Sequence, residues 1–368
     1  MKKVVAIVLL AACVVCVVVG GKYIKESGIL RKYPDPEYLS DSEAAKTPFY
    51  SELSQKEKAV YTALKKGIDK HKTDIALPYE LNGDSYSAIY CMLEKQEPQF
   101  FYLDSKFYTA DKIRDAEILY RIDGDELDKM ADELAEAELD AVDEALEYSS
   151  DYEKALAIHD YLVKNCSYLR EDDDGYSSTV YGCLVEGEAN CEGYAKAFDL
   201  IAGDVGLPCV VIVGETDDGE NHAWNQVKIE GDWYNVDVTW DDTDRGDEVS
   251  RGYFLCDDEQ FLRTHEADES IEPFECDEQK YNYYIYNKLY ADSMDEAEKI
   301  VRRQIAEGSD EIELRFSDGE LCEEFKDKYI NEQYIFDVIF DEEPQRYGKI
   351  TVNTRENEKE DILVISIE

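Results

Sequence analysis

A short hairpin constrains the fold of this chain more than any other feature of its sequence. Two strand-like runs, residues 222–229 and 232–239, are separated by Glu230-Gly231, which predicts a two-residue β-turn. The resulting register pairs Ile229 with Asp232, Trp224 with Asp237 and His222 with Thr239. His222 and Asp237 then become diagonal neighbours on one face of the sheet, with backbones about 7–8 Å apart. A three-residue turn would place Asp237 on the opposite face.

A helix is predicted to begin at Cys191, upstream of this hairpin. Asn190 is a good N-cap residue, and three following apolar side chains share one helical face: Tyr194, Phe198 and Ile201. At a helix N-terminus the dipole and the free backbone N–H groups favour a thiolate, which is the nucleophilic form of cysteine. Cys191 is therefore a candidate nucleophile, although a cysteine without partners would more often be a buried structural residue.

Together, Cys191, His222 and Asp237 predict nucleophilic acyl chemistry. Cys191 would attack an acyl carbon, His222 would take and return protons, and Asp237 would hold the imidazole in one tautomer. The backbone N–H of Cys191 is the natural first donor of an oxyanion hole. Tyr181 is a candidate for the second donor and for substrate binding.

The same residues resemble the transglutaminase-like superfamily, most of all its secreted or surface-anchored bacterial members. The motifs that carry the resemblance, in the order of the family, are Asn190-Cys191-Glu192-Gly193-Tyr194-Ala195, His222-Ala223-Trp224-Asn225 and Trp233-Tyr234-Asn235-Val236-Asp237-Val238-Thr239-Trp240-Asp241. The resemblance covers about residues 151–265 and implies Cys191 as nucleophile, His222 as base and Asp237 as orienting acid. It also implies a papain-like α+β fold, in which the nucleophile helix packs on an antiparallel sheet. Trp224 is expected to line the cleft and to shape the acyl-binding groove.

The resemblance leaves the acyl acceptor open, because the superfamily includes crosslinkers, peptidases, amidases and catalytically silent members. The first hypothesis is an exported cysteine peptidase or amidase that acts on proteins or cell-wall peptides, with acyl transfer to amines as a further activity. The alternative is a non-catalytic envelope protein that binds a partner, and an intact triad counts against it. No cofactor is expected, and the sequence sets no oligomeric state.

Acidic residues dominate the chain, with 86 Asp and Glu against 39 Lys and Arg and a formal net charge of −47. Such a surface repels phosphate backbones, so nucleic-acid binding is set aside. The acidic clusters at residues 172–174 and 241–242 lack the ligand spacing of an EF-hand, so no required metal is predicted.

The N-terminus predicts export. Lys2-Lys3 precede an unbroken apolar run, Val4–Val19, which is longer than a typical signal-peptide core and just short of a comfortable membrane span. An uncleaved membrane anchor is the first interpretation, and secretion after cleavage at Gly21 or lipidation at Cys13 are the alternatives. In each case the body of the protein is extracytoplasmic.

The predicted layout is a membrane anchor or signal segment (1–21), a linker (22–48), a mostly helical α/β region (49–150), a transglutaminase-like catalytic domain (151–276) and a small α/β domain (277–368). Strands are also predicted at Gln99–Leu103, Ile118–Ile122, Tyr281–Tyr286 and Tyr334–Phe340. His159 is expected to pack inside a helical region, whereas His71 and His265 are expected at the surface.

Overall fold

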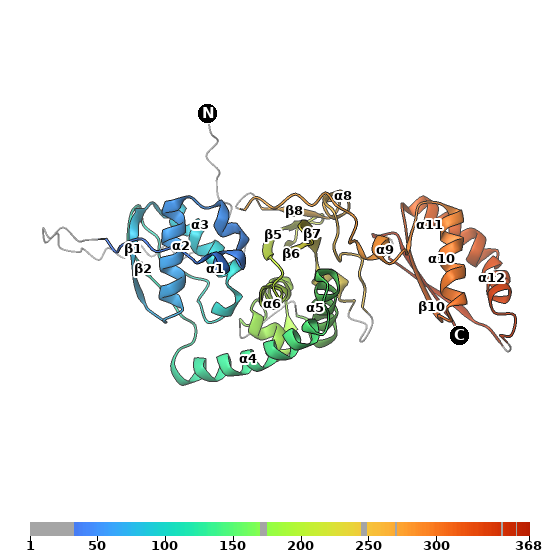
Figure 1. Cartoon of the computed structure of the whole chain (residues 1–368), viewed down its shortest axis with the longest axis horizontal. Helices are drawn as coiled ribbons and strands as arrows, with labels where there is room; N and C mark the ends of the chain where they lie inside the picture. Colours follow the sequence, from blue (N-terminus) through green and yellow to red (C-terminus); the bar gives the residue numbers. More distant parts are fainter. Residues whose placement is uncertain (1–32, 170–174, 244–248, 269–270, 347–348, 358) are drawn as a thin grey trace, which may run out of the picture. The chain divides into compact units, whose positions relative to one another are not determined.

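The computed structural model describes residues 33–169, 175–243, 249–268, 271–346, 349–357 and 359–368. Their contacts divide the chain into two compact units, one ending at Asp277 and one spanning Glu278–Glu368 (Figure 1). The predicted membrane segment, Val4–Val19, lies outside the described residues. Within the described ranges, no helix combines the length and the apolar character that a bilayer span needs.

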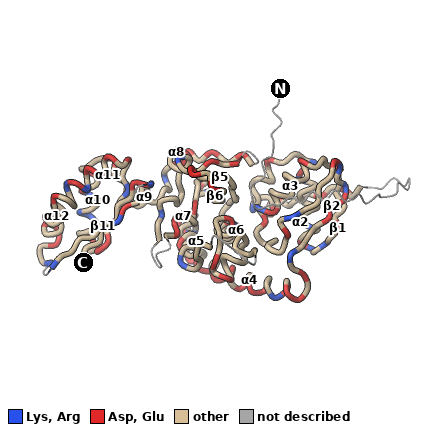
Figure 2. The backbone as a smooth tube through the Cα atoms, turned by 180° about the vertical axis from the view of Figure 1, so that it is seen from behind, with Lys and Arg blue, Asp and Glu red and all other residues tan. Residues whose placement is uncertain are grey.

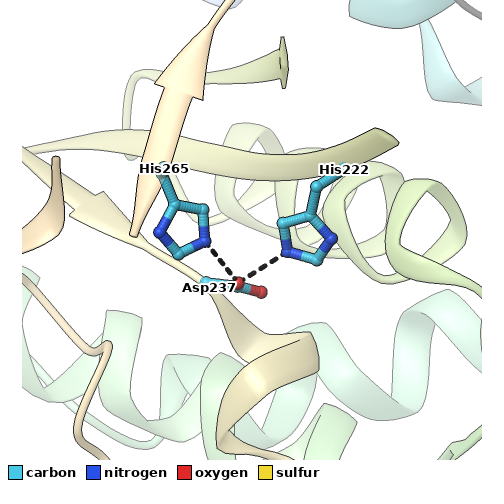
Figure 3. A group of neighbouring side chains, drawn as sticks. All are labelled: His222, Asp237 and His265. Carbon is cyan, nitrogen blue, oxygen red and sulfur yellow. Dashed lines mark hydrogen bonds and ion pairs between the residues drawn. The ribbon is translucent and has the colours of Figure 1, made fainter. Parts of the chain in front are cut away.

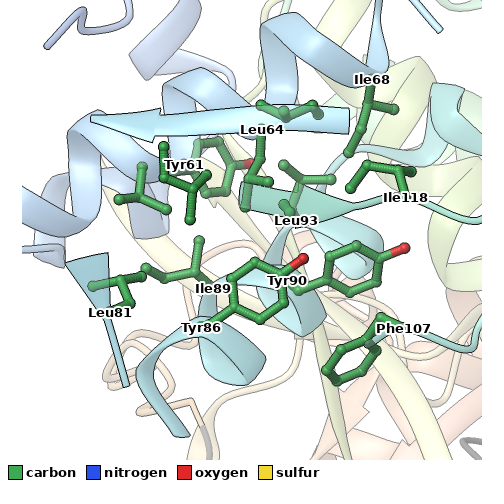
Figure 4. Close-up of a cluster of buried hydrophobic side chains, with 14 of the residues drawn as sticks. Tyr61, Leu64, Ile68, Leu81, Tyr86, Ile89, Tyr90, Leu93, Phe107 and Ile118 are labelled. Carbon is green, nitrogen blue, oxygen red and sulfur yellow. The ribbon is translucent and has the colours of Figure 1, made fainter. Parts of the chain in front are cut away.

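The first part of the larger unit is a small α/β assembly with an antiparallel pair of strands. Its elements are α1 (Asp41–Ala45), η1 (Pro48–Glu52), α2 (Gln55–Ile68), β1 (Asp74–Leu81), α3 (Gly83–Gln96), η2 (Pro98–Phe100) and β2 (Ile113–Glu117). Ser54 and Glu57 form a capping box that starts α2. Helices α2 and α3 bury an aromatic-rich core with the two strands (Figure 4), which includes Tyr61, Leu64, Tyr86, Tyr90, Leu93 and Phe107.

Two strand predictions in this part are wrong. Residues 99–103 form no strand, because Pro98 opens the 3-10 turn η2, where a proline fits the first position. Leu103 makes an isolated bridge to Tyr120. The strand predicted at Ile118–Ile122 is displaced toward the N-terminus, since β2 spans Ile113–Glu117.

The second part of the larger unit has the predicted α+β architecture. Its elements are α4 (Gly124–Leu146), α5 (Asp151–Asn165), β3 (Ser167–Tyr168), η3 (Gly182–Glu186), β4 (Glu188–Ala189), α6 (Cys191–Asp204), β5 (Cys209–Thr216), β6 (Asn221–Ile229), β7 (Asp232–Val236), α7 (Val238–Asp241), α8 (Asp258–Phe261) and β8 (His265–Ala267). Four antiparallel strands form a sheet in the order β7-β6-β5-β8. Helix α6 packs on this sheet, with Ala195 against Val211 and Ala223.

The predicted hairpin register is confirmed for the paired residues, whereas the predicted pairs Trp224–Asp237 and His222–Thr239 do not form, because the second strand ends before them. Strands β6 and β7 pair from Ile229 with Asp232 to Asn225 with Val236. Glu230 and Gly231 both have positive φ, 53° and 110°, as the tight two-residue turn requires. Strand β7 ends at Val236, earlier than predicted, because the next residue caps the short helix α7.

A glutamine from α3 continues the edge of the catalytic sheet. Strand β8 pairs with β5 from Gly214 to Thr216. Further along the same strand, the Gln96 side chain donates to the carbonyl oxygen of Val211 at 2.7 Å and accepts from its N–H at 3.2 Å. Gln96 is buried, so one side-chain amide makes the two bonds that a neighbouring strand would otherwise make.

The smaller unit is an α/β domain with its own core. Its elements are α9 (Tyr283–Tyr286), β9 (Tyr290–Ala291), α10 (Met294–Ala306), β10 (Glu311–Phe316), α11 (Gly319–Lys326), η4 (Asp327–Asn331), α12 (Tyr334–Glu342), β11 (Val352–Asn357) and β12 (Ile362–Ile367). The sheet order is β11-β12-β10-β9, and β9 runs parallel to β10. Apolar side chains from α10, α11, α12 and the central strands form one buried cluster.

Two strand predictions in this unit are also wrong. Residues Tyr283–Tyr286 form the short helix α9, whose N-cap Asn282 accepts a hydrogen bond from the Tyr284 N–H. The run Tyr334–Phe340 belongs to helix α12. The buried residues of α12, Ile335, Val338 and Ile339, recur at helical spacing, which the β-branched composition of the segment obscured.

Acidic side chains are spread over both units (Figure 2). Helix α4, for example, contains a single basic residue, Lys129, along its whole length. Among the described residues, the acidic charge is thus distributed over both units.

Candidate active site

The nucleophile candidate stands at the start of α6, as predicted. Asn190 is the N-cap, and its Oδ1 accepts hydrogen bonds from the N–H groups of Glu192 at 3.0 Å and Gly193 at 3.2 Å. Cys191 itself is half-buried and packs toward β5 and β6, against Val211 and Ala223. Its sulfur thus lies at the positive end of a well-capped helix, where a thiolate is favoured.

Close packing fixes the start of this helix. Gly193 comes so near the segment before η3 that a Cβ built on it would lie 2.3 Å from the Ser177 carbonyl oxygen and 2.8 Å from the Ala189 Cβ. Only a residue without a side chain allows this approach. The close approach holds the first turn of α6, and with it Cys191, against the neighbouring backbone.

His222 and Asp237 form a buried pair at the end of the sheet. The Nε2 atom of His222, on β6, donates to Oδ2 of Asp237 at 2.7 Å. The other carboxylate oxygen, Oδ1, accepts from the N–H groups of Thr239 at 3.0 Å and Trp240 at 3.2 Å, because Asp237 is also the N-cap of α7. The carboxylate is therefore held from both sides.

Electrostatics in the pair favour an imidazolium. Burial alone would lower the pKa of His222, but the charge and hydrogen bond of Asp237 and the contact with Cys191 raise it to about 10. Burial likewise opposes ionisation of Asp237, yet the neighbouring His222, aided by His265, holds the pKa of that carboxyl well below its ordinary value. Because Nε2 of His222 is taken by Asp237, Nδ1 is the nitrogen left to serve the Cys191 thiol.

A second histidine joins the site, which the sequence did not predict. His265, the first residue of β8, donates from Nε2 to the same Oδ2 atom of Asp237 at 3.1 Å (Figure 3). It is 3% exposed, so its predicted place at the surface is wrong. His265 is buried because β8 pairs with β5, with His265 opposite Thr216, in a strand of three residues too short to leave a sequence pattern.

The other histidines serve the scaffold. His159 is buried as predicted, and its ring bonds Asp241 through Nε2 and Asp160 through Nδ1, both at 3.0 Å. His71 is half-buried and stacks on Tyr120, so its predicted surface position is wrong.

The two predicted substrate-binding residues are both buried, and Trp224 packs beside His222 with ring centroids 6.4 Å apart. Trp224 is 2% exposed and packs beside Phe261 and His265, on the face of β6 opposite Ala223. Tyr181 is buried, and its hydroxyl donates to Glu133 on α4 at 2.8 Å. Burial and Glu133 together raise the pKa of Tyr181 to about 12. Roles for Trp224 and Tyr181 in substrate binding stay predictions.

A ring of charges, with Lys196 buried and the other three side chains half-buried, joins α3 to the nucleophile helix. Lys95 contacts Glu94 at 3.0 Å and Glu192 at 2.5 Å, and Lys196 contacts the same two carboxylates at 2.6 and 2.7 Å. These four side chains line a cavity of about 430 Å³ that begins beside the residue after Cys191. The cavity is of the size that holds a small ligand.

His222, Asp237 and His265 have the spacing of a metal-ligand set but are joined by hydrogen bonds. The two Nε2 atoms and a carboxylate oxygen lie within 4.8 Å of one another, which resembles a ligand set. Both Nε2 atoms already donate to Asp237, however, so the group is complete as a hydrogen-bonded network. The arrangement is suited to moving protons.

A capped helix that presents a cysteine packs on an antiparallel sheet that carries a His–Asp pair, which is the arrangement of a papain-like α+β core. The chain carries a domain of the transglutaminase-like superfamily: residues 140–238 match the model of that family, and this range contains Cys191, His222 and Asp237.

Known proteins with similar sequences match about a third of the chain. The kyphoscoliosis peptidase of Mus musculus is 30% identical over 135 residues, which are 33% of this chain and 20% of that protein. The Homo sapiens protein of the same name is 29% identical over 135 residues, with the same coverage. The match thus spans about a fifth of the length of these curated relatives. A crystal structure of a TGase is 22% identical, with a TM-score of 0.28, over 32% of this chain and 34% of that one.

Proposed function

We propose that the chain is a cysteine enzyme that cleaves or transfers acyl groups of protein or peptide amides through a thioester on Cys191. The single observation that carries the proposal is the His222–Asp237 bond of 2.7 Å beside a cysteine at a helix N-terminus. A protein that only binds a partner has no need of this arrangement. The family relationship supports a cysteine enzyme, and the residue roles rest on the geometry.

The reaction would begin from the Cys191 thiolate and the His222 imidazolium. The sulfur attacks the amide carbon, and the N–H group of Cys191 stabilises the oxyanion, since the Asn190 cap occupies the next two N–H groups instead. His222 then gives its proton to the leaving amine, and a thioester forms. Water or a second amine, deprotonated by His222, attacks the thioester and releases the thiol. Asp237 holds the imidazole in place throughout.

The first test is a pH–rate profile of iodoacetamide labelling with the labelled residue mapped by mass spectrometry. Among the described cysteines, Cys191 and Cys91 are half-buried and the rest are buried. Cys91→Ala therefore removes the main competing signal and is the matched control for Cys191→Ala. We expect Cys191 to react rapidly well below the ordinary thiol pKa of about 8.5, and His222→Ala to slow it sharply.

Slow labelling of Cys191 that rises near pH 8.5 and ignores His222 would sink the enzymatic proposal and favour the partner-binding alternative. A second assay separates the two acyl acceptors. Incubation of a protein mixture with a fluorescent primary amine reports transfer, and new peptide termini or released ammonia report hydrolysis. Cys191→Ala must abolish whichever product appears.

We also propose that the enzyme works outside the cytoplasm, held by its N-terminal segment. The support is the apolar run Val4–Val19 behind Lys2-Lys3. Protease accessibility of the intact cells tests this, because an exported body is digested from outside whereas a cytoplasmic one is protected.

A further inference from the structure

The Asp237 carboxylate accepts more hydrogen bonds than an orienting acid needs. Four N–H groups converge on it: two backbone groups of α7 on Oδ1, and the Nε2 atoms of His222 and His265 on Oδ2. The residue is fully buried, so these bonds take the place of solvent. A triad requires one imidazole on this acid, which leaves the second, His265, without a role in the reaction as written.

Aromatic packing and hydrogen bonds to both ring nitrogens fix the ring of His265. It stacks on Phe261 with ring centroids 4.0 Å apart and lies 4.5 Å from the Trp240 ring. Its Nδ1 atom bonds the Thr264 hydroxyl at 2.9 Å, which leaves Nε2 directed at Asp237. His265 lies beyond residues 140–238, the range that matches the family model. Its bond to Asp237 is therefore a feature of this chain that the family match does not include.

Two donors on one oxygen compete for the same negative charge. A hydrogen bond from His265 draws charge from Oδ2, and the carboxylate then stabilises the His222 imidazolium less than it would alone. At the same time the bond fixes where Oδ2 lies, since the α7 groups hold only the other oxygen. The bond from His265 therefore fixes the position of Oδ2, and at the same time it weakens the stabilisation that Asp237 gives to the proton on His222.

We propose that His265 is a positioning residue that fixes Oδ2 of Asp237 and moderates its grip on the His222 imidazolium, so that His222 can hand its proton to the leaving amine. This inference rests on the proposed function, because it concerns the same site. The titratable groups around His222 are Cys191 from α6, Asp237 after β7 and His265 from β8. Around His265 they are Asp237, His222 and Tyr253, whose ring centroid lies 5.6 Å away.

Two substitutions separate positioning from packing. In His265→Leu the donor to Asp237 is lost while an apolar side chain fills the aromatic pocket. In His265→Gln the side-chain amide nitrogen can reach the place of Nε2, so the donor is kept. The readout is the pH dependence of iodoacetamide labelling at Cys191 in the full chain, with EDTA present so that trace metal cannot occupy the imidazoles.

Removing the donor should make the thiolate more persistent at low pH. The imidazolium becomes better stabilised, so the acid limb of the labelling profile in His265→Leu should move to lower pH by about 0.5 to 1 unit. His265→Gln should follow the wild-type profile. A purely structural histidine would predict the opposite pattern, with labelling slowed at every pH and the limb unmoved.

An unmoved limb, or one shifted to higher pH, overturns the proposal while leaving the nucleophile itself intact. Failure of the proposed function is a separate outcome, seen as ordinary thiol behaviour of Cys191 in the wild-type chain. Should His265→Leu not fold, His265→Asn replaces it, because asparagine is polar yet too short to reach Oδ2. The same shift is expected of it, and its absence equally refutes the inference.

Discussion

Replacing Lys196 by methionine should destabilise the larger unit markedly at pH 8 and much less at pH 5.5. Lys196 is one of two ammonium groups that neutralise Glu94 and Glu192 in the charge ring. Methionine keeps the apolar stem of the side chain but removes the charge. Two carboxylates then share Lys95 alone, and the ring carries a net negative charge in a chain that is already strongly acidic.

The magnitude follows from burial. Side-chain exposure in the ring is 6% for Lys196, 18% for Glu192 and 19% for Glu94 and Lys95. Removing one partner of a buried ion pair costs about 3–5 kcal/mol. Because Lys95 still touches both carboxylates, the lower end applies, about 3 kcal/mol at pH 8. For a unit of this size that loss lowers the melting temperature by about 6–12 °C.

The pH dependence has a definite sign. Burial opposes ionisation of Glu94 and Glu192, but the two lysines hold the pKa of each below its ordinary value. Stability from such carboxylates is present above the unfolded pKa of about 4.3 and is lost as the pH falls through the folded pKa. Lys196 is one of the two ammonium groups that lower the pKa of these carboxyls, so their pKa rises when it is removed, and protonation at lower pH then takes away part of the excess charge. The difference in unfolding free energy between Lys196→Met and the wild type should therefore become smaller as the pH falls.

Urea denaturation followed by tryptophan fluorescence measures this in the full chain. All three tryptophans, Trp224, Trp233 and Trp240, lie in the larger unit, so the smaller unit adds no tryptophan signal. The matched control is Glu192→Gln with Lys196→Met, which restores neutrality and should be no less stable than Lys196→Met alone. If Lys196→Met lowers the unfolding free energy by less than about 1 kcal/mol at pH 8, or if the loss grows toward pH 5.5, the ring is effectively solvated and the reasoning is refuted.

Three further outcomes are expected. Gly193→Ala should lower the unfolding free energy by about 3 kcal/mol, because the new Cβ meets the rigid carbonyl of Ser177. The same substitution should slow labelling of Cys191. An unaltered melting temperature would contradict the close packing. Burial opposes protonation of His159, but Asp160 and Asp241 raise its pKa. The stability that the protonated ring contributes is therefore present below about pH 6.5 and is lost at higher pH. In melting curves from pH 6 to 9, His159→Gln should lower the melting temperature most at pH 6. The smaller unit expressed alone should give a cooperative melt, and a featureless one would mean that its core is incomplete.

The sequence predicted the hairpin and the helix start of the candidate site because their signals are local. A two-residue turn fixes the register of β6 and β7, and the N-cap Asn190 fixes where α6 begins. Both are decided within a few residues, and the apolar pattern of the strands agrees with them. Register and helix start were enough to bring His222 within hydrogen-bonding distance of Asp237.

Several of the failures share a physical cause, which is that tertiary contacts decided the outcome. His265 has no local signal, because β8 has three residues and becomes a strand only by pairing with β5. The segment Tyr334–Phe340 is rich in residues that suit strands, yet packing of one face against the smaller core makes it a helix. The charge ring likewise joins residues about a hundred positions apart, and no short-range pattern predicts such pairing.

The bond between Gln96 and β5 bears on how the proposed enzyme could be controlled. Proteolytic activation of many hydrolases depends on a leading segment that can leave without harming the body. In this chain the segment before α4 supplies two hydrogen bonds to Val211 through the side chain of Gln96, and Val211 packs against Cys191. Removal of that segment would leave the backbone groups of Val211, next to Cys191, without partners. An unpaired strand edge of this kind can pair with another chain. The region before α4 is thus bonded into the sheet of the candidate site, and we expect a cut that removed it to disturb the packing around Cys191.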